Sequence, residues 1–440
     1  MFWSFSTAHR SGDPRRRRRH RVGIALLIGL ALAVAACGTS TGGGGHPTPT
    51  PKPPTATATP APFAPWRIVS SPNVEHPVPF PSINGLNAVS ALSPTDAWAV
   101  GGTFAGAPGP SASLIERWNG TAWQLVATSG PGNLYGVAAV SANDVWAVGR
   151  QGGEYDNRYQ AYVFTTLIMH WTGSQWSVVP SPNPDLIASY LNSVAAISAN
   201  NIWAVGYTGR APGSGDALIE HWDGKVWGVV SSQKPAGATG SVYTAVTRIP
   251  GTNQLWAVGY AQYAATGGRT TAYFQPLIER WNGNTWHIVA SPALPSDAFS
   301  GNLNGVVALS ATDAWAVGDY TGNDHTLHPL IAHWDGASWK VATGPAQRGG
   351  SLTGVAAVGA HDVRAVGHTT TGDTNNPNTH LLIEQWNGTA WQVAVSPEPS
   401  GAEYGALGGV TTDGAGNYWA VGSYRPSDNN SNLTLIARCP

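Results

Sequence analysis

Residues 221–227 read HWDGKVW, and the pattern Trp-x-Gly-x-x-Trp inside this stretch recurs along the chain. The other copies are WNGTAW at 118–123, WTGSQW at 171–176, WNGNTW at 281–286, WDGASW at 334–339 and WNGTAW at 386–391. A second phrase, WAVG, begins at Trp98, Trp146, Trp203, Trp256, Trp315 and Trp419, and survives as RAVG at Arg364. One unit is therefore repeated, with seven copies of one phrase and six of the other.

The spacing and content of the unit predict an all-β fold. Successive copies of WAVG begin 48, 57, 53, 59, 49 and 55 residues apart, and a period near fifty is typical of a propeller blade. Each unit contains four runs that favour short strands, which we name a to d: GVAAVS, WAVG, LIEHW and WSVV in their most regular forms. Asn-Gly or Asp-Gly between strands c and d indicates a tight hairpin turn.

The two ends of the chain complete one unit between them. After the seventh WAVG, strand c is present at 433–438, but the chain stops at Pro440 without a strand d. A strand d without its unit stands at 66–73 (WRIVSSPN) and matches WSVVPSPN at 176–183. We therefore predict a seven-bladed β-propeller over residues 66–440, whose last blade is closed by the N-terminal strand (66–73) with the C-terminal strands. Such closure removes exposed sheet edges.

The tryptophans follow the repeat. The chain has 20 Trp, and all except Trp3 occupy the three repeat positions in WAVG and on either side of the c–d turn. Rings that recur at equivalent sites indicate a core between blades rather than a platform for stacking sugars.

The first 65 residues have another character. Seven arginines and then the apolar run from Val22 to Ala36 indicate a secretory signal peptide over residues 1–36, too short for a membrane span. The stretch Val34-Ala35-Ala36-Cys37 resembles a bacterial lipobox, which implies cleavage and lipidation at Cys37; the alternatives are an ordinary signal peptide or an uncleaved anchor, with an incidental cysteine. Residues 37–65, rich in Gly, Pro and Thr, then form a tether, and the protein lies on the extracellular face of the cell membrane, held by its lipid anchor alone.

Charge and cysteine content exclude several classes of protein. Removal of residues 1–36 leaves 16 basic against 23 acidic residues, which does not fit a nucleic-acid-binding protein. Cys439 is the only other cysteine, so the chain is neither a disulfide scaffold nor a thiolate metal site. We expect Cys439 to be a small residue near the end of the last strand.

The order of small apolar strand, VWAVG, variable stretch and LIExWxGxxWxxV resembles the kelch repeat and covers residues 66–440. The double glycine of that repeat is present only at Gly101-Gly102, and the Asp/Asn-Gly-x-x-Trp turns also resemble those of Asp-box propellers. Kelch-like copper oxidases need a Cys beside a Tyr, which is absent here. Sialidases carry Arg-Ile-Pro, but Arg248-Ile249-Pro250 falls in an a–b turn, and we interpret it as a chance match.

Repeated polar residues on strand c do not indicate catalysis. Glu116, Glu220, Glu279 and Glu384 occur once per unit, too far apart for a glycosidase pair, and we expect each to be half exposed or paired with a neighbouring polar group. His170, His221 and His333 follow at the next position and are expected at the surface. His325 and His328 alone are weak evidence for a metal.

The variable b–c stretches are the candidate binding site, because loops carry most binding functions. Tyr and Arg dominate interface hot spots, and two stretches, 150–165 and 260–275, are rich in both. The candidate ligand-binding residues are Tyr155, Asp156, Arg158, Tyr159, Tyr162, Tyr260, Tyr263, Arg269 and Tyr273. Packing of these stretches on each other is the alternative.

These observations lead to a hypothesis of function. The propeller binds a protein or glycan ligand through the face that carries the b–c and d–a connections, without catalysis and as a monomer. The alternatives are a carbohydrate-active enzyme of sialidase-like or lyase-like type and a structural role in the envelope. We expect no metal site and no cofactor; the sequence leaves open an ion in the axial channel.

Overall fold

A computed structural model describes residues 64–75, 82–104, 111–128, 130–209, 215–265, 271–345, 347–371, 378–427 and 431–440. The chain divides into two units, Met1–Thr59 and Pro60–Pro440, and every described residue belongs to the second. The expected signal peptide, the lipidated Cys37 and the tether as far as residue 63 lie outside the described residues. The described part of the chain contains no helix with the length and apolar character needed to span a bilayer.

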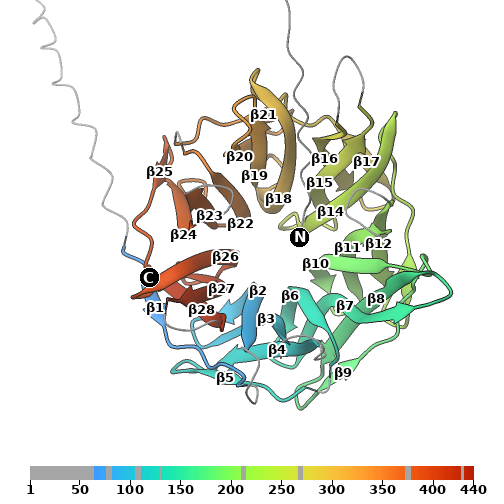
Figure 1. Ribbon diagram of the computed structural model, residues 1–440, viewed down its shortest axis with the longest axis vertical. Helices are drawn as coiled ribbons and strands as arrows, with labels where there is room; N and C mark the ends of the chain where they lie inside the picture. The colour runs from blue at the N-terminus through green and yellow to red at the C-terminus, as the bar shows by residue number, and fades with distance from the viewer. Residues whose placement is uncertain are drawn as a thin grey trace, which may run out of the picture. The chain divides into compact units, whose positions relative to one another are not determined.

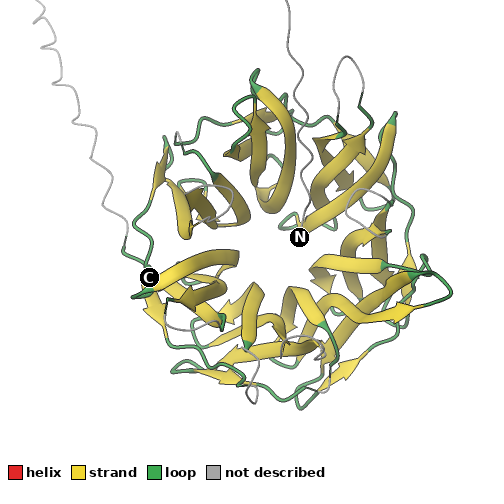
Figure 2. Cartoon of the chain, in the orientation of Figure 1, coloured by secondary structure: helices red, strands yellow, loops and turns green. Residues whose placement is uncertain are grey.

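The described residues form β-strands without helices (Figure 2). Five sheets contain four consecutive strands each, paired in chain order. Their strands are β2 (Ile83–Ser93), β3 (Asp96–Phe104), β4 (Ser111–Trp118), β5 (Trp123–Leu125), β6 (Asn133–Ser141), β7 (Asp144–Asp156), β8 (Ala161–Trp171), β9 (Trp176–Val178), β10 (Ser189–Ser198), β11 (Asn201–Thr208), β12 (Ala217–Trp222), β13 (Trp227–Val229), β14 (Ala238–Arg248), β15 (Leu255–Tyr263), β16 (Tyr273–Trp281), β17 (Trp286–Val289), β18 (Ala298–Ser310), β19 (Asp313–Gly322), β20 (Leu327–Trp334) and β21 (Trp339–Val341). The sheets surround a central opening with their first strands innermost, which is the arrangement of a β-propeller (Figure 1).

A sixth sheet has eight strands and contains both ends of the repeat region. Its strands are β22 (Gly350–Gly359), β23 (Asp362–Thr371), β24 (Asn378–Trp386), β25 (Trp391–Val393), β26 (Ala402–Thr412), β27 (Tyr418–Pro426), β28 (Leu433–Cys439) and β1 (Arg67–Val69). A single parallel pair, Thr379 with Tyr404, joins the four-stranded group β22–β25 to the group of β26, β27, β28 and β1. The expected N-terminal strand is present in shortened form, and it pairs antiparallel with β28, with Ile68 opposite Ala437.

The glycine of WAVG is required by a bulge in the neighbouring strand. The register of β10 and β11 shifts between Leu191 and Ser193, which brings the backbone of β10 close to Gly206. A Cβ atom on Gly206 would lie 1.9 Å from the carbonyl oxygen of Tyr190. The equivalent distances lie between 1.9 and 2.1 Å at Gly101, Gly149, Gly259, Gly318, Gly367 and Gly422. No side chain fits at this position, so every copy of the repeat keeps glycine.

The extra residue at each bulge links neighbouring groups of strands. Asn192 Nδ2 donates to the carbonyl oxygen of Tyr243 in the next group at 2.7 Å. Equivalent bonds run from Asn87 to Leu134 (2.7 Å), from Thr244 to Leu303 (2.6 Å), from Asn304 to Leu352 (2.9 Å) and from Thr353 to Leu407 (2.6 Å). In the last group the position is Gly408, where an added Cβ atom would meet the oxygens of Asn87 and Leu86 at 3.0 and 3.1 Å. The last group therefore packs backbone to backbone against the first.

Tryptophan rings fill the joints between groups, as the sequence predicts. The Trp203 ring lies 4.6 Å from the ring of Trp281 and 5.6 Å from that of Trp286, both in the following group. The same triad forms around Trp98, Trp146, Trp256, Trp315 and Trp419. Trp419 contacts Trp118 and Trp123 of the first group, so the last joint has the same construction as the others.

The three histidines of strand c are not surface residues, which corrects the expectation from the sequence. His170 is half-buried and stacks on Trp146 with ring centroids 3.9 Å apart, and its Nε2 lies 2.8 Å from Asp144 Oδ1. His221 and His333 occupy equivalent places. These side chains hold the tryptophans of their own group, so their recurrence reflects packing.

One joint departs from the pattern. Arg364 replaces the tryptophan of WAVG, lies 5.1 Å from the centroid of the Tyr418 ring and pairs with Asp362 at 3.2 Å. Cys439, which stands where the other groups carry the strand c tryptophan, is fully buried. Its Sγ donates to the carbonyl oxygen of Ala64 at 3.0 Å. Cys439 is thus the expected small residue of the last strand, and it also holds the segment that leads into β1.

The four glutamates of strand c are fully buried, so of the two alternatives expected from the sequence, half exposure is wrong, and pairing with a neighbouring polar group is found for Glu116 and Glu279. Ser71 Oγ donates to both carboxylate oxygens of Glu116 at 3.0 Å, and the Gln233 backbone N–H donates to Glu279 at 3.0 Å. Both oxygens of Glu220 and of Glu384 have no hydrogen-bond partner in the described part of the chain. Burial raises the pKa of Glu116, Glu220 and Glu384 to about 8, so these carboxyls stay protonated at neutral pH.

Candidate functional site

The stretch 150–165 is a hairpin arm and not the loop expected from the sequence. Strand β7 continues to Asp156 and β8 begins at Ala161, and the two strands stay paired beyond WAVG with one register shift between Gly152 and Glu154. Tyr155 lies opposite Tyr162, the rings meet edge to face at 5.4 Å, and their exposed fractions are 52% and 61%. The arm therefore presents two aromatic rings to solvent.

The remaining candidates on this arm lie around its turn. Asp156 forms an ion pair with Arg158, and Arg158 lies 5.4 Å from the centroid of the Tyr159 ring. The backbone N–H and guanidinium of Arg158 lower the pKa of Asp156. Tyr155 and Asp156 also line an open pocket of about 490 Å³ at the base of the arm. The structure thus brings together all five predicted residues of this stretch.

In the stretch 260–275, the end of β15 and the start of β16 pair as a second arm. Tyr263 and Tyr273 lie opposite each other with stacked rings 5.5 Å apart. Tyr260 meets Phe274 edge to face at 5.0 Å, and burial raises the pKa of Tyr260 to about 12. Arg269 lies outside the described residues. Tyr260 therefore belongs to the packed base of this arm, while Tyr263 and Tyr273 form its flank.

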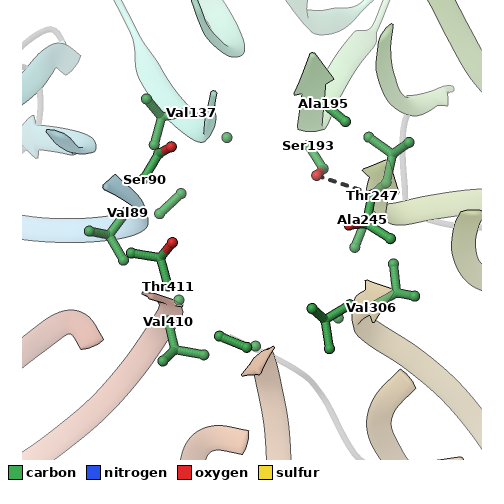
Figure 3. A pocket seen from close by; sticks show the side chains of 18 of the residues that line it. Val89, Ser90, Val137, Ser193, Ala195, Ala245, Thr247, Val306, Val410 and Thr411 are labelled. Atoms are coloured by element: carbon green, nitrogen blue, oxygen red, sulfur yellow. Dashed lines mark hydrogen bonds between the residues drawn. The ribbon is translucent and has the colours of Figure 1, made fainter. Parts of the chain in front are cut away.

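The first strands of all the groups line an axial channel of about 450 Å³ (Figure 3). Its wall consists of small side chains, many of which carry a hydroxyl or an amide: Asn87, Ser90, Asn192, Ser193, Thr244, Thr247, Asn304, Thr353 and Thr411. Because the first strands run in the same direction along the channel, the bulge residues mark the end of the channel on the side of the arms. Tyr135 occupies the bulge position of β6 and so lies at this mouth.

A cluster of one arginine and four aromatic rings lies beside Tyr135 at the channel mouth. The Cζ atom of Arg150 lies 4.5 Å from the ring centroid of Phe164, 5.3 Å from that of Tyr190 and 5.9 Å from that of Tyr135. Tyr207 stacks on Tyr190 with centroids 4.6 Å apart. Burial raises the pKa of Tyr135, Tyr190 and Tyr207, so their hydroxyls remain protonated donors at neutral pH.

The fifth and sixth repeats carry a different set of polar side chains at the same mouth of the channel. The buried Asp319 accepts hydrogen bonds from Ser351 Oγ at 2.6 Å and from Asn304 Nδ2 at 3.2 Å. Burial lowers the pKa of the neighbouring His368, although Asp319 opposes this shift. The carboxylate of Asp319 is thus bound within the protein, whereas the opposite side of the mouth carries the arginine.

The sequence analysis missed Arg150, Tyr135, Tyr190 and Tyr207, although one signal identifies part of this cluster. The residue directly after WAVG is of six types in seven repeats: Gly102, Arg150, Tyr207, Tyr260, Asp319, His368 and Ser423. Variation at one fixed position of an otherwise regular repeat marks a place that packing does not dictate. Tyr135 and Tyr190 carry no such signal, because their contacts with Arg150 depend on the bulge and on the joint between two groups.

The weaker candidates do not form sites. His328 Nε2 lies 3.0 Å from Thr326 Oγ1 and 3.2 Å from Asp324 Oδ1, and His325 lies in the adjoining turn. The residues that the structure describes contain no group of three His, Cys, Asp or Glu side chains placed to hold a metal. Arg248 of the Arg-Ile-Pro match contacts only backbone oxygens, those of Thr252 and Ile197, among its recorded hydrogen bonds.

Comparison with known proteins gives structural likenesses only. No protein-family model matches the chain, and no curated protein matches it. A structure of YCF48 bound to a D1 peptide is 14% identical, covers 87% of this chain and 99% of that one, and has a TM-score of 0.48. The extracellular domain of the one-component system BT4673 from B. thetaiotaomicron is 10% identical, with a TM-score of 0.45, and the match covers 80% of this chain and 38% of that one. A protein of unknown function from Dyadobacter fermentans is 10% identical over 86% and 99% of the two chains, with a TM-score of 0.47.

Proposed function

We propose that the chain is a lipid-anchored, seven-bladed, kelch-like β-propeller that binds a protein or glycan ligand on the outer face of the cell membrane. Two contacts support seven blades closed as a ring: β1 completes the last group by pairing with β28, and Trp419 packs against Trp118 and Trp123 of the first group. The basic and apolar N-terminal run, Cys37 and the Pro/Thr-rich tether support the anchor.

The observation that carries the binding function is the difference between the two faces of the propeller. One face carries two hairpin arms with tyrosine pairs and the Arg150 cluster at the channel mouth. The other face carries short turns closed by their own side chains, as where Asp223 Oδ1 accepts from the backbone N–H groups of Lys225 and Val226. Tyrosine and arginine supply rigid contact area with a polar end, which suits recognition.

Catalysis by the repeated acids does not fit this arrangement. Glu116, Glu220, Glu279 and Glu384 are fully buried at the joints, so they have no access to a glycosidic bond. We therefore propose a binding module without catalysis.

The test uses the full-length chain in mild detergent on a glycan array and in pull-downs with envelope extract. The variants are Tyr155→Ser/Tyr162→Ser and Tyr263→Ser/Tyr273→Ser, and the matched control is Val226→Ser, a residue 63% exposed on the opposite face. We expect at least one tyrosine pair to be needed for binding, while melting is unchanged and the control binds normally. Equal binding by all variants, loss of binding in the control, or cleavage of a glycan would contradict the proposal.

A further inference from the structure

Arg150 is a half-buried cation without an acidic partner. In the described part of the chain no carboxylate lies within ion-pair distance of it. Arg117 and Arg364, which also lie over aromatic rings, are held by Asp96 and Asp362 at 3.0 and 3.2 Å. Arg280, which lies over the ring of Trp256, has no acidic partner either, but its guanidinium donates to the amide oxygen of Gln254 at 2.7 Å. Arg150 differs from these arginines in lying among three aromatic rings instead of one.

The surroundings of Arg150 favour the binding of an anion. The rings of Phe164, Tyr190 and Tyr135 exclude part of the water around the guanidinium, which strengthens its attraction for a negative group. The hydroxyls of Tyr135 and Tyr190 hydrogen-bond with the guanidinium, which engages part of its N–H groups. A guanidinium has five N–H donors, and a hydroxyl that accepts from one of them keeps its own O–H to donate, so the three side chains together still offer donors to a negative group.

The balance of charge favours a carboxylate among anions. The planar fork of a guanidinium matches the two oxygens of a carboxylate or of a phosphate, but a single cation balances only a single negative charge. A phosphate dianion would need a second cation. The charged group on the opposite side of the channel mouth is the Asp319 carboxylate, which is an anion and so cannot balance the second charge of a phosphate.

The side chains that line the channel below this mouth indicate which class of molecule carries the carboxylate. The channel wall combines hydroxyl and amide groups, as at Ser90 and Thr411, with small apolar side chains, as at Val89 and Ala195. Small hydroxyl and amide groups suit the many hydroxyls of a saccharide, and a cavity of about 450 Å³ accepts a unit of a few sugar rings at most.

We infer that Arg150, with the hydroxyls of Tyr135 and Tyr190, binds the carboxylate of an acidic sugar at the mouth of the axial channel. This inference rests on the proposed binding function and names its ligand class. Arg150 is the charge that recognises the ligand, the two tyrosines orient the carboxylate, and the polar wall of the channel receives the sugar hydroxyls.

Calorimetric titration of the full-length protein tests the assignment. The probes are trigalacturonate, neutral galactotriose, an acetylated peptide rich in glutamate, and inorganic phosphate. The variants are Arg150→Gln, which removes the charge, and Arg150→Lys, which keeps the charge but loses the fork. Arg280→Gln is the matched control, because Arg280 also lies over an aromatic ring without an acidic partner but does not line the channel.

We expect trigalacturonate to bind the unaltered protein, with an affinity at least about tenfold weaker in Arg150→Gln and intermediate in Arg150→Lys. Arg280→Gln should bind normally, and galactotriose should bind at least about tenfold more weakly than trigalacturonate. If Arg150→Gln lowers the melting temperature but leaves the uronate affinity unchanged, Arg150 is structural and the inference is wrong. Preference for the peptide or for phosphate would also overturn it. If no acidic probe binds while tyrosine-dependent binding persists on the array, this inference fails and the proposed function stands.

Discussion

The Glu220→Gln variant tests whether the buried Glu220 carboxyl is uncharged in the folded protein. Glu220 is 0% exposed, and burial raises its pKa from 4.5 to about 8. Between these two values the folded protein keeps a proton that the unfolded chain has released. The free energy of unfolding therefore falls as the pH rises through this range, and the contribution of Glu220 is complete only below about pH 4.5.

The size of the effect follows from the shift in pKa. Each pH unit inside the range removes about 1.4 kcal/mol per carboxyl, so Glu220 alone accounts for about 3 kcal/mol between about pH 5 and pH 7.5. Glutamine has nearly the same shape and carries no charge at any pH. The stability of Glu220→Gln should therefore decline less steeply with pH, while Glu116, Glu279 and Glu384 continue to contribute.

Urea denaturation followed by tryptophan fluorescence, at about pH 5 and about pH 7.5, measures this difference. We expect the variant to gain about 3 kcal/mol relative to the unaltered protein between these two conditions. Glu154→Gln, at an exposed position on the first arm, is the control and should follow the unaltered protein. Parallel pH dependence of Glu220→Gln and the unaltered protein would refute the reasoning, because it would mean that Glu220 is ionised in the folded state.

Two further predictions concern the repeat itself. Gly206→Ala should destabilise the protein by about 2 kcal/mol or more, because the new Cβ atom meets a carbonyl oxygen at 1.9 Å. Gly228→Ala is the control and should be tolerated, because a Cβ atom there meets nothing within 4 Å. Equal urea midpoints for the two variants would contradict this prediction. Trp203→Ala should cost about 3 to 5 kcal/mol in the same assay, because its ring fills a joint against Trp281 and Trp286, and a loss below about 1 kcal/mol would show that the joint does not depend on the triad.

The repeat phrases predicted the strands and the tryptophan joints because both follow from local patterns. Asn-Gly and Asp-Gly specify a turn directly, and the match between 66–73 and 176–183 located the N-terminal strand. The burial of Glu220 was not predictable, because a charged residue on a repeated strand usually faces solvent and only the neighbouring group covers it. The contact of Arg150 with Tyr190 likewise depends on how two groups meet, and periodicity within one repeat does not describe that.

The pairing of the two chain ends affects how the protein is made. The segment at Ala64 and its partner Cys439 are separated by 375 residues, so the first described strand is synthesised long before the last. At a rate of roughly 5 to 20 residues per second, this interval lasts on the order of 20 to 75 seconds. Throughout this time β1 lacks the strand with which it pairs, and the growing chain accumulates complete four-stranded groups in an open arc. The two ends of the propeller can meet only after β28 has been synthesised.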